Sequence, residues 1–391
     1  MHSFVRGKPT HGSVYIFDIG SSSVAAALAL TDFHEGTRIL EETRAIAPQR
    51  KWTDANSQQK KHLEMLREAA SAIFRPQDSK PIRIVVFLSS RWHIAKARVA
   101  SRIMPVPTAV TQALIDSIVD EDLADLEREL PQNAAEYLVI DREVMSVDLN
   151  GYAVPHPVGM TARSIAVHYF VSIADSRLVR DIEDRIRTHL HAEVDQFYSL
   201  TYSLYRSLVQ ETGARDFLAI RSSSAVTDAF VVRNGVMVAS GTIDAGIEKL
   251  LSEIADATGL DVPHVRSLIS VSGSSAGGAS SIERIRKPLE QAGAAYAGLL
   301  HELLGQLSSH ALLPVTTFLF TEAAFKPLFD IMLAVPQFSL LTLTGSVLDV
   351  RGPAHKYLPG LAKIATGDHP DLFLALEASS LLYLEKHMNM I

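Results

Sequence analysis

The stretch V-Y-I-F-D-I-G-S-S-S-V-A-A-A-L-A-L, from Val14 to Leu30, decides how the rest of this chain is interpreted. An apolar run enters Asp18, a Gly-Ser-Ser-Ser turn follows, and a second run of small apolar residues leaves the turn. This pattern predicts two buried strands joined by a tight hairpin. An acidic side chain then lies at the end of the first strand.

The residues of this turn have the chemistry of a phosphate site. Gly20 can adopt a positive φ and bring the backbone close to a ligand. The turn amides and the hydroxyls of Ser21, Ser22 and Ser23 can donate to phosphate oxygens. Asp18 could hold water on a Mg²⁺ ion, which makes it the candidate metal residue. The alternative is a β-hairpin whose acid only caps the turn.

Composition restricts the classes of protein to consider. At 391 residues the chain exceeds one ordinary core, so two or more domains are expected. The net charge of −7 and the scattered Lys and Arg residues argue against a nucleic-acid partner. The sequence has no cysteine, which excludes disulfides and thiolate metal sites. No window offers about twenty uninterrupted apolar residues, so we expect a soluble or peripheral protein.

The order of predicted elements suits an α/β fold. Two strands, a helix from Lys61 to Phe74 and a buried strand from Pro81 to Ser90 give β-β-α-β over the first ninety residues. Pro105 and Pro107 suggest a boundary. A strongly acidic helix from Thr111 to Leu130 follows, and we interpret its acids as a solvated face.

A second hairpin of the same kind appears about two hundred residues later. The stretch F-L-A-I-R-S-S-S-A-V-T-D-A-F-V-V-R-N-G, from Phe217 to Gly235, is again a strand, a turn of small residues and a strand. A later strand from Thr316 runs into a turn at Ala324. A hairpin repeated in this way is what an internally duplicated fold would leave in the sequence.

These motifs together resemble the actin-like ATPase fold, and within it the bacterial FtsA and PilM family. Val14 to Leu30 resembles the first phosphate hairpin, Phe217 to Val232 the second, and Phe318 to Ala324 the adenosine-binding strand and turn. The stretch from Tyr137 to Ala174 resembles the segment that closes the inserted subdomain of FtsA, and Pro157-Val-Gly-Met160 follows the family pattern.

The resemblance implies a fold class and a division of the chain. The fold class is α/β, with duplicated actin-like (ribonuclease H-like) lobes and an FtsA-type inserted α/β subdomain. Residues 1–91 and 177–215 would form the first lobe and 92–176 the inserted subdomain. Residues 216–391 would form the second lobe, with a helical subdomain at 244–315.

The second hairpin and the adenosine turn depart from the family pattern. The family has an acidic residue and several glycines where this chain has Arg221, Ser222, Ser223, Ser224 and Ala225, and only Thr227 and Asp228 are kept. The adenosine turn, normally a glycine pair, includes Thr321 and Glu322. Side chains in place of glycine crowd the pocket. We therefore expect weakened or lost ATP hydrolysis, with no catalytic residue assigned.

The candidate cofactor site combines the three motifs, with ATP and Mg²⁺ as the implied ligands. It consists of Asp18, Gly20, Ser21, Ser22, Ser23, Arg221, Ser222, Ser223, Ser224, Asp228, Thr321 and Glu322. An arginine opposite Asp18 also predicts an ion pair, an Asp18–Arg221 clasp that closes the cleft without metal. The alternatives are that Arg221 turns to solvent or binds a phosphate.

The resemblance implies a cytoplasmic scaffold or adaptor that recruits partners to a membrane-associated cell-division or type IV pilus machine. The partner would be an FtsZ-like protein or the tail of a pilus inner-membrane protein, and self-polymerisation would use the inserted subdomain. The residues up to Ile391 contain no basic amphipathic helix, so membrane association is expected only through partners. The alternatives are an active ATPase switched by Mg-ATP and a sugar or acetate kinase of the same fold.

Overall fold

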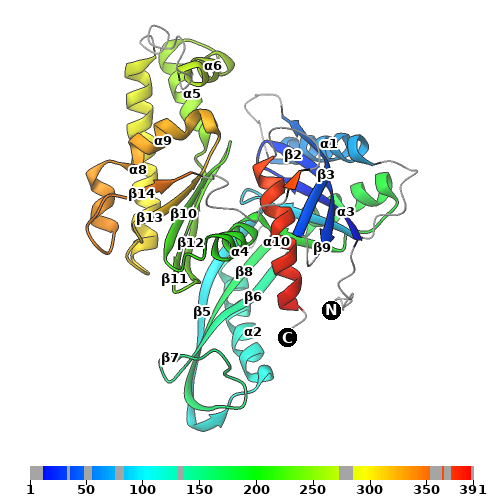
Figure 1. Ribbon diagram of the computed structural model, residues 1–391, viewed down its shortest axis with the longest axis vertical. Coiled ribbons are helices and arrows are strands. Elements are labelled where there is room, and N and C mark those ends of the chain that lie inside the picture. The colour runs from blue at the N-terminus through cyan, green and yellow to red at the C-terminus, as the bar shows by residue number, and fades with distance from the viewer. Residues whose placement is uncertain are drawn as a thin grey trace.

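The computed structural model describes residues 12–32, 36–47, 55–74, 83–130, 136–272, 285–352, 363–364 and 371–388. The strands in these ranges form three sheets (Figure 1). Two of the sheets lie side by side with helices between them, and the third extends away from both as an arm.

The first sheet is built around the Val14 hairpin. Its order is β15 (Lys363–Ile364), β3 (Gly36–Ile46), β2 (Ser23–Asp32), β1 (Gly12–Ile19), β4 (Arg83–Leu88) and β9 (Gln196–Ser199). β1 pairs antiparallel with β2 and parallel with β4. Helices α1 (Ala55–Ile73) and α3 (Ser176–Leu190) pack on the face that carries Tyr15 and Phe17.

The second sheet repeats this arrangement around the other hairpin. Its order is β12 (Val236–Ile243), β11 (Thr227–Arg233), β10 (Phe217–Ser222), β13 (Thr316–Phe320) and β14 (Asp349–Arg351). β10 pairs antiparallel with β11 and parallel with β13, as β1 does with β2 and β4. The two predicted hairpins therefore occupy equivalent places in two similar sheets.

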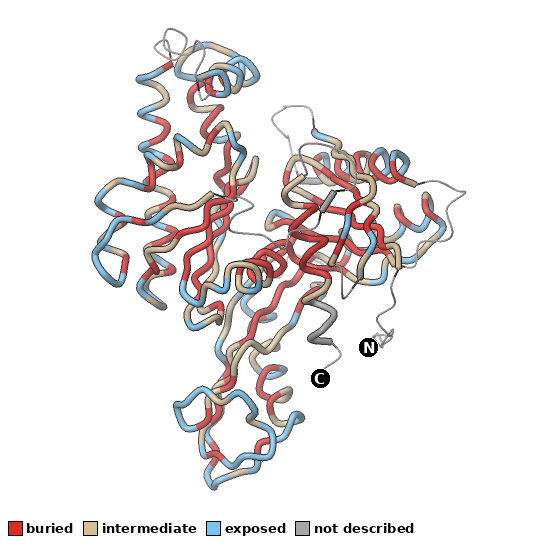
Figure 2. The backbone as a smooth tube through the Cα atoms, viewed as in Figure 1, coloured by how far each residue is buried: buried red, intermediate tan, exposed pale blue. Residues whose placement is uncertain are grey.

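Helices fill the outer face of the second sheet and the space between the two sheets. The outer face is covered by α5 (Ile247–Thr258), α6 (Val262–Ser272), α8 (Arg286–Ser308), η1 (Ala323–Phe325), α9 (Lys326–Leu333) and η2 (Pro336–Leu341). Between the sheets lie α4 (Leu200–Thr212) and α10 (Leu372–Met388). Figure 2 shows this central layer as buried. One apolar cluster joins Ile16 of the first sheet, Leu376 of α10 and Phe217 of the second.

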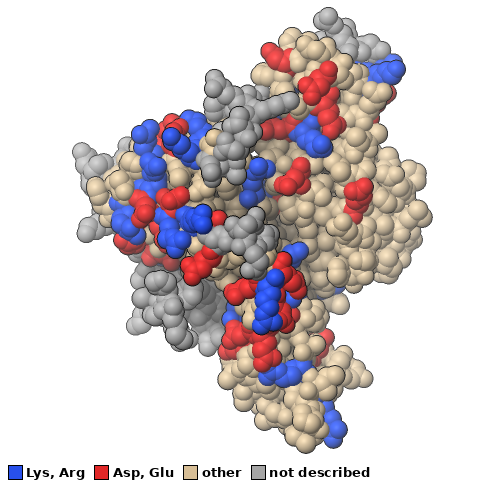
Figure 3. Space-filling view, turned by 180° about the vertical axis from the view of Figure 1, so that it is seen from behind, with Lys and Arg blue, Asp and Glu red and all other residues tan. Residues whose placement is uncertain are grey.

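The third sheet and one helix form the arm. The sheet order is β5 (His93–Ala109), β8 (Thr161–Asp175), β6 (Tyr137–Leu149) and β7 (Tyr152–Ala153). The acidic helix α2 (Gln112–Glu129) packs its apolar side on this sheet, and the Thr111 side chain caps it. Asn150 and Gly151 both have positive φ, as expected of a tight two-residue turn. Figure 3 shows the acids of α2 interspersed with basic residues.

Three details of the secondary structure differ from the sequence-based prediction. β5 runs on through Pro105 and Pro107, because irregular pairing between Ile103 and Thr108 leaves these prolines out of the ladder. The sequence patterns of residues 137–141 and 144–149 each indicate a separate strand, but the structure joins them in one bulged strand, β6. β3 was not predicted at all. The predicted domain boundaries stay a prediction.

Among the helices of the described ranges, none has the length and apolar character needed to cross a bilayer.

Candidate functional site

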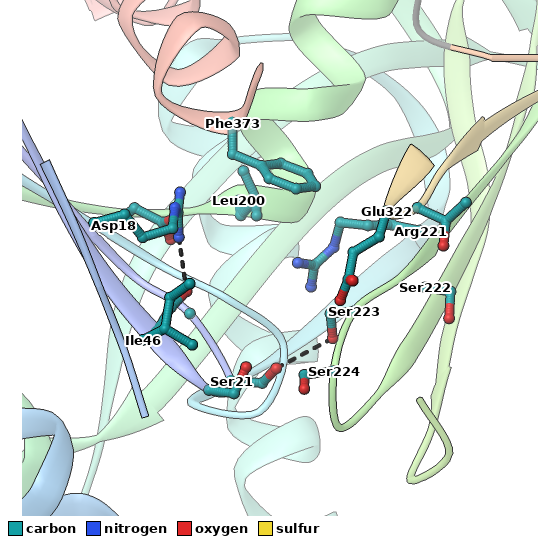
Figure 4. A pocket seen from close by; sticks show the side chains of 15 residues that line it. Asp18, Ser21, Ile46, Leu200, Arg221, Ser222, Ser223, Ser224, Glu322 and Phe373 are labelled. Carbon is teal, nitrogen blue, oxygen red and sulfur yellow. Dashed lines mark hydrogen bonds and ion pairs between the residues drawn. The ribbon is translucent and has the colours of Figure 1, made fainter. Parts of the chain in front are cut away.

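A cavity of about 290 Å³ lies between the turns of the two hairpins (Figure 4). Its volume is at the lower end of the range for small-molecule sites. Of the residues predicted for the cofactor site, all except Asp228 line this cavity. Four lining residues were not predicted, namely Arg44, Ile46, Leu200 and Phe373.

The first turn is fixed from both sides. The Gly20 amide donates to the Ser23 carbonyl at 2.8 Å, and the Trp92 indole donates to the Gly20 carbonyl at 2.7 Å. The positive φ expected at Gly20 is not found. Glycine is required for space instead, since a Cβ there would lie 2.9 Å from the Ser23 carbonyl oxygen.

The second turn is held against the start of α5. The Ile247 amide donates to the Ser223 carbonyl, and the Glu248 amide donates to the Ser224 carbonyl, both at 2.9 Å. A Cβ at Gly246 would lie 2.4 Å from the Ser224 oxygen, so only glycine allows this contact.

The serine hydroxyls of the second turn are engaged within the protein. Ser222 contacts the Tyr296 hydroxyl at 2.9 Å, Ser223 donates to the Val226 carbonyl at 2.8 Å, and Ser224 donates to Glu248 at 2.7 Å. These serines were predicted to line the cofactor site and to crowd it in place of glycine. In this structure they stabilise their own turn.

The two turns touch each other directly. The Ser21 hydroxyl donates to the Ser223 hydroxyl at 3.3 Å, and the Ala225 amide donates to Ser21 Oγ at 3.4 Å. A phosphate chain in the space between the turns would have to separate them. The two turns are therefore in direct contact at one edge of the cavity.

Asp18 is neutralised by an arginine that the sequence analysis did not identify. Arg44 on β3 donates to Asp18 Oδ2 at 2.9 Å and to Ser23 Oγ at 2.7 Å. It also makes a bidentate pair with Asp371, at 2.5 and 3.0 Å. Burial lowers the pKa of Arg44, but the two carboxylates raise it by more, so its pKa is well above the usual value.

The predicted Asp18–Arg221 clasp is wrong. Arg221 is 5% exposed and pairs with Asp228, with Nε donating to Asp228 Oδ2 at 2.9 Å. Thr242 donates to the other oxygen of Asp228 at 2.9 Å. Figure 4 shows Arg221 reaching toward the cavity from the side opposite Asp18. Each of the two residues has its counter-ion on its own sheet.

Two buried carboxyl groups beside the cleft lack full hydrogen bonding. Among the described residues, Asp18 Oδ1 has no hydrogen-bond partner, and neither oxygen of Glu377 on α10 has one. Glu377 is completely buried, which raises its pKa well above 4.5, and the charge of Asp18 raises it further. Burial also raises the pKa of Asp18, although Arg44 opposes this. Burial therefore favours the protonated form of both carboxyl groups in the folded protein.

His93 lies at the start of β5, close to Asp228 and Arg221. Burial lowers the pKa of His93 to about 4, although the charge of Asp228 and the backbone of Ser89 favour the protonated ring. A neutral histidine is therefore buried where the arm meets the second sheet.

The turn predicted to bind adenosine is also internally paired. Glu322 forms an ion pair with Arg266 of α6 at 2.5 Å, and the Arg266 guanidinium lies 5.5 Å from the centre of the Phe325 ring. The carboxylate expected near a purine is thus held by a cation on the rim of the cavity.

The residues present do not fit a Mg²⁺ ion beside Asp18. Arg44 occupies one of its oxygens, and the facing position holds Arg221 where the family has an acid. In the described ranges, no group of three or more His, Asp or Glu side chains could hold a metal ion. The two arginines of the cavity are paired with Asp18, Asp371 and Asp228, and the hydrogen bonds of the turn hydroxyls described above stay within the protein.

Two unpredicted residues of this site carry a weak sequence signal. Glu377 is the single charge in L-F-L-A-L-E-A-S-S-L-L, and a lone acid in an apolar helix indicates a buried carboxyl group. Arg44 stands in R-I-L-E-E-T-R-A-I, whose partial alternation indicates a strand.

Comparison with known proteins supports the fold assignment. No protein-family model matches the chain, and no curated protein matches its sequence significantly. A chain of the PilM–PilN type IV pilus biogenesis complex aligns with a TM-score of 0.62 and 14% identity, over 96% of this chain and 99% of that one. This likeness confirms the predicted fold, so the chain has the actin-like ATPase fold.

Two other solved structures align at lower scores. Ethanolamine utilization protein EutJ from Carboxydothermus hydrogenoformans has a TM-score of 0.46 and 12% identity, over 96% of this chain and 90% of that one. MreB 5 of Spiroplasma citri, bound to AMPPNP, has a TM-score of 0.43 and 12% identity, over 98% of both chains.

Proposed function

We propose that this protein is a cytoplasmic actin-fold adaptor of the PilM and FtsA type. It binds the cytoplasmic tail of an inner-membrane protein and so brings other components to a membrane-associated machine. Type IV pilus assembly is the preferred pathway, and cell division with an FtsZ-like partner is the alternative. The observation that carries the proposal is the alignment with the PilM–PilN complex over nearly the full length of both chains.

An adaptor needs a stable shape more than a nucleotide cycle, and the contacts of the cleft support this. The turns of the two hairpins touch through Ser21 and Ser223, and both cleft arginines have counter-ions on their own sheets. Hydrolysis would require these contacts to be exchanged for contacts to Mg-ATP. We therefore propose that ATP hydrolysis is weakened or lost.

The competing proposal is an actin-like ATPase switched by Mg-ATP. The first turn favours it, because Asp18, Gly20 and the three serines of the family pattern all line the cavity. The neutralisation of Asp18 by Arg44 opposes it. A turnover assay separates the two proposals, since an active enzyme would lose hydrolysis in an Asp18→Asn variant.

Self-association is the second part of the proposal, and two uncharged apolar patches support it. The tip of the arm exposes Ile103 and Tyr152, which are 85% and 78% exposed. The second patch lies between residues 331 and 348, a stretch without charged side chains, where Ile331 and Leu340 are 70% and 81% exposed. Different patches at distant places suit head-to-tail contacts between copies.

Sedimentation velocity over a range of concentrations tests this second part. Wild type should form concentration-dependent oligomers, and a Tyr152→Asp variant should stay monomeric at the same concentrations. Val271→Asp is a matched control, because Val271 of α6 is also exposed but belongs to neither patch. A wild type that remains monomeric throughout would remove self-association and leave the adaptor role.

The adaptor role itself is tested by titrating the full chain with the cytoplasmic segment of the PilN-like protein from the same genome. Saturable binding without nucleotide supports the proposal. Absence of binding in the presence and absence of Mg-ATP would contradict it.

A further inference from the structure

The side chain beside Asp18 is Arg44, which the sequence analysis did not predict. Arg44 comes from β3, two strands away from β1 in the first sheet. The register places Asp18 opposite Ala25, and Ala25 opposite Arg44, so the three side chains share one face of the sheet. Because the middle residue is alanine, the arginine can pass over it to reach the carboxylate.

The guanidinium of Arg44 is held by bonds to all three of its nitrogens. Nε and one terminal nitrogen bind Asp371, that same terminal nitrogen binds Asp18, and the other terminal nitrogen binds Ser23. Such a bidentate pair fixes the plane and position of the cation. Asp371 is fixed in turn, since its Oδ1 accepts from the Phe373 and Leu374 amides at the start of α10.

The charge of this cluster argues for a permanent cation. Asp18 is 2% exposed, and a buried carboxylate needs a counter-charge or a metal. Arg44 supplies that charge at Oδ2 of Asp18, and within the described residues Oδ1 accepts no hydrogen bond. A divalent ion on Asp18 would lie next to the Arg44 guanidinium, which donates to the same carboxylate. The two cations would repel each other.

We propose that Arg44 is the resident cation of this cleft and excludes divalent metal from Asp18. A ligand of the cleft is therefore bound without a Mg²⁺ ion held by Asp18. The same side chain also connects the first turn, through Ser23, to the start of α10, through Asp371. This inference concerns the cleft alone and holds for either pathway.

The experiment measures Mn²⁺ binding to the full chain, using the electron paramagnetic resonance signal of free Mn²⁺. Wild type and Asp18→Asn should bind Mn²⁺ equally, because Asp18 contributes no site in either. Arg44→Gln should gain a site with affinity at least about tenfold higher, since a neighbouring unit charge has been removed. Adding Asp18→Asn to Arg44→Gln should abolish this gain.

Arg38→Gln is the matched control, because Arg38 lies on the same strand and is exposed. It should bind Mn²⁺ as wild type does. Two results would overturn the proposal, namely wild-type Mn²⁺ binding that disappears in Asp18→Asn, or a folded Arg44→Gln protein that gains no site. Should Arg44→Gln fail to fold, the comparison of wild type with Asp18→Asn still decides. None of these measurements involves a partner, so their failure is distinct from failure of the adaptor role.

Discussion

Replacing Glu377 by glutamine should make the protein more stable at neutral pH and less sensitive to pH. Glu377 is completely buried on α10, and neither of its carboxyl oxygens has a hydrogen-bond partner in the part of the chain that the structure describes. Burial raises its pKa well above the ordinary value of 4.5, and Asp18 adds to the effect. In the unfolded chain the same group ionises near its ordinary value.

The sign of the pH dependence follows from this difference. Below pH 4.5 Glu377 is protonated in both the folded and the unfolded state, so its ionisation does not lower the free energy of unfolding. As pH rises above that value the unfolded state releases its proton first, and the free energy of unfolding falls by about 1.4 kcal/mol per pH unit. The fall continues until the pH reaches the raised pKa of the folded state. Glutamine cannot ionise, so this contribution disappears.

Urea denaturation of wild type and Glu377→Gln at each pH unit from 5 to 8 measures the effect. The difference in unfolding free energy should grow in favour of glutamine by up to about 1.4 kcal/mol for each unit, and it should level off where the pH reaches the raised pKa of the folded state. Glu290→Gln, at an exposed position of α8, is the control and should leave the wild-type profile unchanged. The reasoning would be refuted if the difference in unfolding free energy between the two proteins were constant across this range, that is, if both lost the same stability between pH 5 and pH 8.

Three further predictions rest on single contacts. Asp371→Asn keeps the helix-capping oxygen but loses the charge that faces Arg44, so it should lower the free energy of unfolding by about 1–2 kcal/mol in urea denaturation. Asp371→Ala also removes the cap and should lower it by about 1 kcal/mol more. Equal losses in the two variants would show that the cap contributes nothing. Gly246→Ala forces a Cβ against the Ser224 carbonyl and should cost at least about 2 kcal/mol, whereas Gly298→Ala, with open space in α8, should stabilise by about 0.5–1 kcal/mol; two similar thermal midpoints would contradict this. Burial lowers the pKa of His93 to about 4, so its contribution to stability is lost as pH falls from about 6.5 to 4, and His93→Leu should flatten that part of the acid-unfolding curve; an unchanged acid midpoint would count against a buried neutral imidazole.

Local sequence patterns were sufficient to predict both hairpins and the acidic helix. The apolar runs around Asp18 and Arg221, each interrupted by small turn residues, specify their strands without tertiary information. The Asn150-Gly151 turn and the cap at Thr111 are likewise encoded within a few residues. Because the two hairpins occupy equivalent places in similar sheets, predicting them also predicted most of the cavity lining.

The ion pairs of the cleft depend on register and on distant contacts. Arg221 lies directly opposite Asp228 in the β10–β11 ladder, so its counter-ion was present in the sequence of its own hairpin. The expected Asp18–Arg221 clasp neglected this nearer acid. The Arg44 pair could not be derived in the same way, since β3 is mostly polar and Asp371 is 327 residues away.

The central claim is that this actin-fold protein binds its membrane partner without a nucleotide cycle. The most direct measurement is calorimetric titration of the full chain with the cytoplasmic segment of the PilN-like protein from the same genome, first in EDTA and then with Mg-ATP. We predict saturable binding with the same affinity, within about twofold, in both conditions. The reason is that Arg44 already neutralises the charge of Asp18, and Arg221 that of Asp228, without Mg-ATP. Binding that appears only with Mg-ATP, or that Mg-ATP changes tenfold or more, would contradict the account.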